Sequence, residues 1–122
     1  MRLIRPIFGT ATVVISSTVI AADMLPLKQG IYVPAETACK GAPNSEIVNY
    51  WGGNSSIGYA QAECTIKKLA KKGSVFTLTD ECKDIQSGDA IVGGPTVVKV
   101  SSRTTFAMGG RKYRYCGTKV QF

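Results

Sequence analysis

The chain contains no histidine, which excludes Ser-His and Cys-His catalytic pairs and most zinc sites. Carboxylates are the remaining route to acid–base chemistry, as in glycoside hydrolysis. Four of the eight form the only cluster, Asp80, Glu81, Asp84 and Asp89. The first two are adjacent on an expected strand and would point to opposite faces, whereas the last two lie in a turn-like segment, where aspartate is common. The sequence therefore predicts a protein that is not an enzyme, with a carboxylate-based hydrolase as an alternative.

The four cysteines are the second candidate for chemistry. They are Cys39, Cys64, Cys82 and Cys116. Zinc sites usually place thiolates in close C-x₂₋₄-C pairs, and redox enzymes use C-x-x-C, and neither spacing occurs here. An even number of cysteines in a short chain is typical of a disulfide framework. We therefore expect two disulfides, no free thiol nucleophile, no bound metal and no cofactor.

Basic residues form two candidate binding regions. The densest group predicts a lysine-rich hairpin tip and consists of Lys67, Lys68, Lys71 and Lys72. Such a group is most simply a solvated turn that discourages edge aggregation, and the alternative is a loop that reaches an acidic cleft or an anionic glycan. The second region is one face of a C-terminal hairpin, with Arg103, Lys112 and Arg114.

Trp51 is the only tryptophan and adjoins a Gly-rich turn over residues 52–56. Its simplest place is the core. A tryptophan beside a turn could instead be an exposed binding anchor, so it is a third candidate binding residue.

The N-terminus has the parts of a secretory signal peptide. Arg2 and Arg5 supply a positive start, residues 10–20 are mostly apolar, and Ala21 and Ala22 supply small residues before Asp23. The apolar run is short for a membrane anchor and is interrupted by hydroxyl residues. We expect residues 1–22 to be a signal peptide and residues 23–122 to be one disulfide-linked β domain, located in the periplasm or secreted, with no membrane span after cleavage.

The expected mature part is basic. Removing Arg2 and Arg5 leaves 13 Lys and Arg residues against eight Asp and Glu residues, a net charge of +5. This balance favours an acidic-surfaced protein or an anionic glycan as partner. Exported proteins rarely meet nucleic acid, so we expect none, and we expect a monomer.

The middle of the chain allows two structures. Residues 59–72 have helical spacing of apolar residues and a possible stop at Gly73, so a short helix is one alternative. Cys64 and Cys82 are equidistant from Gly73, and a hairpin turning at residues 72–74 would place them opposite each other. This hairpin needs a bulge near Lys67-Lys68. We favour the hairpin and predict the Cys64–Cys82 disulfide.

The C-terminal third predicts another hairpin. Residues 104–108 and 111–116 flank Gly109-Gly110, a strong two-residue turn signal. That turn places Phe106 opposite Tyr113 on a core face, and the basic residues named above on the other face. Cys116 is then expected to pair with Cys39, which fastens the last strand to the loop after the first.

The predicted fold is all-β, a small antiparallel meander or barrel of six to eight short strands with two disulfides. The run GIYV, Cys39, YWGG, Cys64-Thr-Ile, Gly73, Cys82 and YRYC resembles small exported proteobacterial proteins of unassigned function. The expected architecture is also similar to periplasmic inhibitor barrels that block lysozymes or proteases. That analogy implies a proteinaceous inhibitor of a hydrolase, and a cell-envelope module that binds anionic glycan or peptidoglycan is the alternative.

Overall fold

The computed structural model describes residues 23–59, 62–91 and 94–122. In these ranges the fold is all-β, with one short 3-10 turn and no α-helix, as the sequence predicts. The expected signal peptide, residues 1–22, lies outside the described residues. No helix in the described ranges is long and apolar enough to cross a bilayer.

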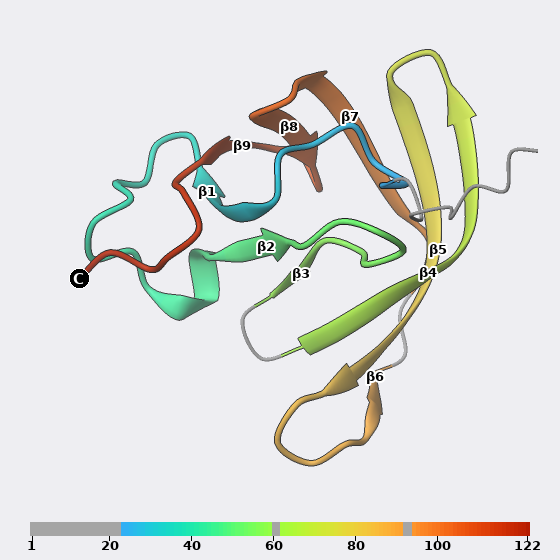
Figure 1. Ribbon diagram of the computed structural model, residues 1–122, viewed down its shortest axis with the longest axis horizontal. Coiled ribbons are helices and arrows are strands. Elements are labelled where there is room, and N and C mark those ends of the chain that lie inside the picture. The colour runs from blue at the N-terminus through green and yellow to red at the C-terminus, as the bar shows by residue number, and fades with distance from the viewer. Residues whose placement is uncertain (1–22, 60–61, 92–93) are drawn as a thin grey trace, which may run out of the picture.

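The described residues form nine strands and one 3-10 helix (Figure 1). In chain order they are β1 (Gly30–Pro34), η1 (Asn44–Glu46), β2 (Val48–Tyr50), β3 (Gly58–Tyr59), β4 (Ala62–Lys72), β5 (Val75–Asp84), β6 (Ala90–Ile91), β7 (Thr96–Ser102), β8 (Thr105–Met108) and β9 (Arg111–Tyr115).

The sheet is a meander that curls until its edge strands approach each other. Its order is β3-β2-β1-β9-β8-β7-β5-β4, and β6 pairs only with β5, off this path. Between the two edges, Ser55 forms an isolated bridge with Thr65, and the amide of Ser56 donates to the carbonyl of Cys64 over 3.0 Å. The result is a nearly closed antiparallel barrel of eight strands, and this closure leaves little of the sheet edge unpaired.

The middle of the chain forms the predicted hairpin, and the alternative helix over residues 59–72 is wrong. Cys64 pairs with Cys82 across β4 and β5, and the register shifts between Ile66 and Lys68, where the sequence required a bulge. The predicted turn is one residue too long, because Lys72 pairs with Val75. The bulge offsets this difference farther along the strands, so the cysteines still face each other.

The C-terminal hairpin has the predicted register. Phe106 pairs with Tyr113 across β8 and β9, and their rings stack with centroids 5.0 Å apart. The Tyr32 ring contacts Phe106 edge-on at 5.1 Å. Aromatic pairs in these arrangements add to the stabilisation from apolar burial.

The barrel core also contains residues that the sequence did not indicate. Leu25 and Leu27 precede β1 in a segment expected to be a lead-in, and both are buried in the main core cluster. The Tyr50 hydroxyl donates to the carbonyl of Leu25. The segment that precedes β1 is therefore part of the barrel core.

A second apolar cluster lies on the other face of β1. Ile31 and Val33 pack there with Ile47 and Cys116, whereas Tyr32 points into the barrel core. The loop after β1 covers this cluster and is fastened by the Cys39–Cys116 disulfide. Both predicted disulfides are thus confirmed, and the described residues contain no free cysteine.

Candidate functional site: a basic row across the sheet

Three lysines share one row on the outer face of the sheet. Lys72 of β4 pairs with Val75 of β5, and Val75 in turn pairs with Lys99 of β7. The row continues through Ala107 of β8 to Lys112 of β9. Neighbouring strands are about 4.8 Å apart, so consecutive lysines of this row lie roughly 10 Å apart across the sheet. We call Lys72, Lys99 and Lys112 the basic row.

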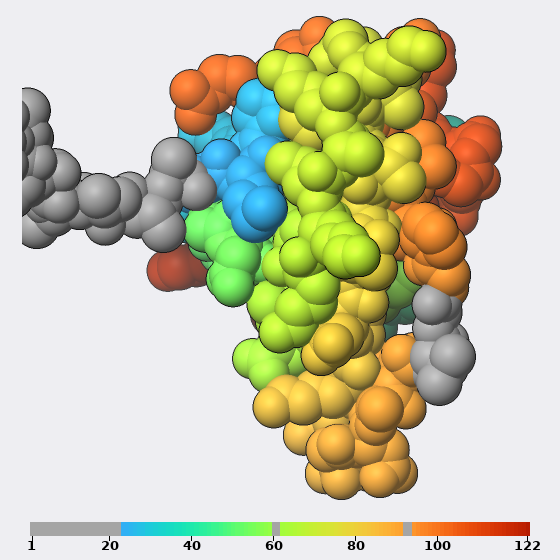
Figure 2. Space-filling model, turned by 90° about the vertical axis from the view of Figure 1, so that its right-hand side faces the viewer, coloured from blue at the N-terminus to red at the C-terminus, as the bar shows by residue number. Residues whose placement is uncertain are grey.

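Alternation along each strand puts the basic row on the outside. Phe76, Val98 and Phe106 are buried in the barrel core. Their strand neighbours Val75, Lys99 and Ala107 pair in one line with Lys72 and Lys112. Successive strand residues point to opposite faces, so the row residues point away from the core. All three lysines are exposed. Figure 2 shows β4, β5 and β7 side by side on one face of the molecule.

Among the described residues, the positions nearest to the basic row on the same face of the sheet carry no acidic side chain. On one side the paired positions are Ala70, Thr77 and Val97. On the other side Thr105 pairs with Arg114. Among the described residues none of the three lysines forms an ion pair. The row therefore presents uncompensated positive charge to solvent.

The four lysines of β4 do not gather at one hairpin tip. Lys67 lies at the bulge, where its Nζ is 4.0 Å from Glu81 Oε1. Lys71 Nζ lies 5.6 Å from the centroid of the Phe76 ring. Lys68 and Lys72 are exposed. The group is thus spread along an edge strand, and only Lys71 and Lys72 border the Gly73-Ser74 turn.

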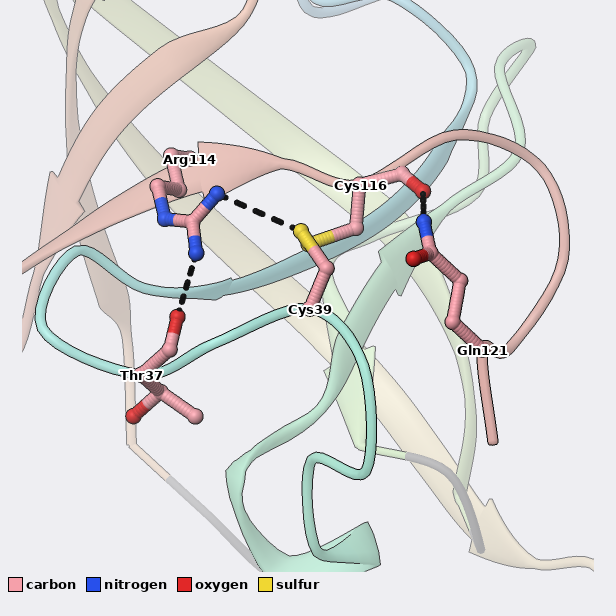
Figure 3. The surroundings of a disulfide bond; sticks show 5 residues. All are labelled: Thr37, Cys39, Arg114, Cys116 and Gln121. Carbon is pink, nitrogen blue, oxygen red and sulfur yellow. Dashed lines mark hydrogen bonds between the residues drawn. A yellow bond between two sulfur atoms is a disulfide. The ribbon is translucent and has the colours of Figure 1, made fainter.

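The predicted basic face of the C-terminal hairpin is divided by the structure. Arg114 lies on the same side of β9 as Lys112, but the loop after β1 covers it (Figure 3). Its Nη2 donates to the carbonyl of Thr37 over 2.6 Å, and its Nη1 lies 3.3 Å from Cys39 Sγ. Arg103 is exposed beside the segment that precedes β1, where its carbonyl accepts a hydrogen bond of 2.7 Å from the amide of Lys28.

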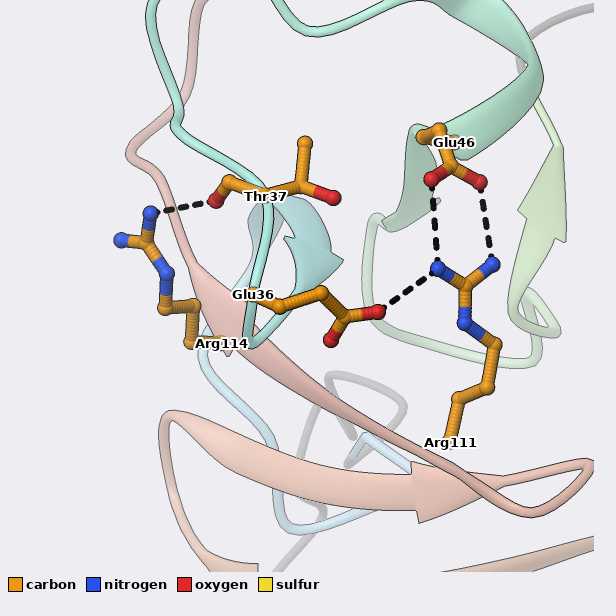
Figure 4. Close-up of polar contacts among 5 residues, drawn as sticks. All are labelled: Glu36, Thr37, Glu46, Arg111 and Arg114. Atoms are coloured by element: carbon orange, nitrogen blue, oxygen red, sulfur yellow. Dashed lines mark hydrogen bonds and ion pairs between the residues drawn. The ribbon is translucent and has the colours of Figure 1, made fainter.

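Arg111 is a structural residue that the sequence did not single out. Its guanidinium binds both oxygens of Glu46, at 2.9 and 3.2 Å, and one oxygen of Glu36 at 2.8 Å (Figure 4). These hydrogen bonds raise the pKa of Arg111 and lower the pKa of Glu36 and Glu46 below their usual values. Two of the eight carboxylates are thus used to fasten the loop and η1 to β9.

Trp51 is not a core residue. It follows β2, and 46% of its surface is exposed. It lines a shallow groove of about 440 Å³ with Ile85 and the Ser55-Ser56 turn. The structure thus leaves this side chain accessible, away from the basic row.

The carboxylates of the β5 region have separate surroundings. Asp80 Oδ2 accepts a hydrogen bond of 2.5 Å from the Ser56 hydroxyl, whereas Glu81 faces Lys67. Asp84 Oδ1 accepts from two amides of the following turn. Asp80 and Glu81 therefore face different partners, as expected for adjacent strand residues.

Lys99 is the member of the basic row that the sequence reasoning missed. Its place between buried Val98 and partly buried Val100 marks it as an outward residue, but only the pairing of β7 with β5 places it between Lys72 and Lys112. Comparison with known proteins adds nothing to this site, because no family model, curated protein or solved structure matches the chain.

Proposed function

We propose that this chain is an exported, non-enzymatic binding protein that captures an anionic partner through the basic row. The observation that carries the proposal is the alignment of Lys72, Lys99 and Lys112 across five strands, without an acidic residue beside them. Two disulfides support an oxidising compartment. A nearly closed, crosslinked sheet also holds the strands that carry these lysines in fixed relative positions, which limits the ordering cost of binding.

The partner that this geometry fits best is an extended anionic polymer, such as an acidic glycan of the cell envelope. The lysines are separated across the sheet by Val75 and Ala107, so they do not converge on one small ion. A chain with repeated negative charges could lie across the strands and contact each lysine in turn. Such contacts are exposed, and their contribution should weaken as salt increases.

The test compares two triple variants of equal charge. One replaces Lys72, Lys99 and Lys112 with Ala, and the control replaces Lys40, Lys83 and Lys119, which are also exposed. Binding of alginate oligomers, with neutral dextran as the reference ligand, is measured by calorimetry at two salt concentrations. We expect the row variant to bind alginate at least about tenfold more weakly, a loss of about 1.4 kcal/mol. Equal losses in both variants would refute the proposal, because net charge alone would then explain binding.

Inhibition of a hydrolase is a second candidate function. The β4–β5 turn lies at the margin of the molecule (Figure 1), and Lys71 and Lys72 border it, so it could enter an acidic cleft. Lys71 belongs only to the turn, whereas Lys99 and Lys112 belong only to the row. A lysozyme or protease whose inhibition is lost with Lys71→Glu but kept with Lys99→Glu would favour this candidate over polymer binding.

A further inference from the structure

A cavity of about 400 Å³ opens at the end of the barrel opposite the β4–β5 turn. Cys64 and Cys82 line it, so the disulfide between β4 and β5 forms part of its wall. Its apolar lining consists of Ile57, Tyr59, Ala62, Ile91 and Met108. Mouths of β-barrels are frequent ligand sites, and the volume lies in the range of small-molecule pockets.

Two of the apolar lining residues remain accessible to a ligand. Tyr59 is 51% exposed and Ile91 is 45% exposed, although both are large apolar side chains. They belong to the short strands β3 and β6, which both contribute to the lining of this cavity. Covering them with an apolar ligand would remove apolar surface from water, which stabilises a complex.

The charged groups that line this cavity are opposite in sign to the net charge of the protein. Its lining includes Asp80 and Asp84 and contains no lysine or arginine within the described residues. Neither carboxylate forms an ion pair in that part of the chain. Among the described residues the only hydrogen-bond donor to Asp80 is the Ser56 hydroxyl, and Ser56 is itself buried. In a chain of formal net charge +7, the lining of this cavity is locally negative.

We infer that the barrel end binds a small apolar molecule that carries one ammonium group. The apolar part would contact Ile57, Ile91 and Met108, and the ammonium group would lie toward Asp80. An ion pair gains strength where the surroundings exclude water. This inference does not depend on the basic row, because the cavity lies at another part of the barrel and selects the opposite charge.

The test uses a matched pair of probes, 4-phenylbutylamine and 4-phenylbutanol, which differ in the charged group. We expect the amine to shift amide resonances of the cavity lining in ¹⁵N NMR spectra, with an affinity at least about tenfold higher than that of the alcohol. Asp80→Asn keeps an acceptor for the Ser56 hydroxyl and removes the charge. It should reduce amine affinity to that of the alcohol and leave alcohol binding unchanged.

A second variant separates the cavity from its charge. Ala62→Phe should fill the space beside the disulfide and abolish binding of both probes. Equal affinity of amine and alcohol in the natural protein would overturn the inference, as would shifts confined to residues outside the cavity. Both results come from the natural protein, so they hold even if a variant fails to fold. Alginate binding by the basic row should be unchanged in both variants, so failure here is distinguishable from failure of the proposed function.

Discussion

Two groups of basic residues differ in their surroundings. One lies beside the loop after β1, and the other is the basic row. Arg111 binds two carboxylates, and Arg114 binds a backbone carbonyl beside a disulfide. Lys72, Lys99 and Lys112 have no ion-pair partner among the described residues. The two arginines contact other parts of the chain, whereas the three lysines present their charge to solvent.

This difference shows why the net charge of a chain does not locate its binding surface. Arg114 and Lys112 lie on the same side of β9, but the loop after β1 covers Arg114 and leaves Lys112 exposed. The residue types also differ in a way that fits these roles. Arginine presents several donors in a planar arrangement, which suits several acceptors at once, whereas lysine is a flexible, strongly hydrated point charge.

The largest change in the free energy of unfolding should come from removing the disulfides. Replacing Cys39 and Cys116 with Ala should lower the free energy of unfolding by up to about 4.5 kcal/mol, and replacing Cys64 and Cys82 by up to about 3 kcal/mol, as expected from the chain entropy of the loops. The two loops separate cysteines 77 and 18 residues apart. Urea unfolding of both double variants measures this. A larger loss of stability from removing the Cys64–Cys82 disulfide would contradict this order. The β4–β5 hairpin, which carries Lys72, would then depend on its disulfide more than the loop that covers Arg114 does.

A smaller effect is expected from Arg114→Ala. The change leaves the carbonyl of Thr37 without its donor in a partly buried place, which should cost about 2 kcal/mol. Lys112→Ala is the matched control on the same strand and face, and its effect should stay within about 0.5 kcal/mol. Urea unfolding measures both. Similar losses for the two variants would show that Lys112 also has a structural role.

The strand pairing could be predicted because turns fix register. Gly109-Gly110 determines every pair of β8 and β9, and the symmetry of Cys64 and Cys82 about Gly73 identifies the longer hairpin. Helix propensity in residues 59–72 was misleading, because cross-strand pairing and the disulfide outweigh local preference there. The Cys64–Cys82 disulfide followed from the register of this hairpin, whereas Cys39–Cys116 followed from the expectation that the last strand is fastened to the loop after the first.

The surface roles could not be predicted to the same extent. Whether Arg114 is exposed depends on where the loop after β1 lies, and no local pattern specifies this. The position of Lys99 in the basic row depends on β5 pairing with β7 while β6 stays off the main path. Leu25 and Leu27 alternate like strand residues but bury without a strand, so their short segment gave no clear signal.

The smallest expected difference concerns pH and Arg111. Arg111 lowers the pKa of Glu36 and Glu46 from the ordinary value of 4.5. A lowered carboxyl pKa stabilises the folded state above the ordinary value, and this stabilisation is lost as the pH falls through the lowered pKa. Arg111→Gln should therefore melt at a lower temperature than the natural protein at pH 7, and the difference should disappear in acid. Thermal unfolding between pH 7 and pH 2 measures this, with Lys99→Gln as the control that should show no pH-dependent difference. If the Arg111→Gln difference persisted at the acid end, its cause would be lost packing of the arginine side chain, and the distinction between paired arginines and free lysines would not rest on charge.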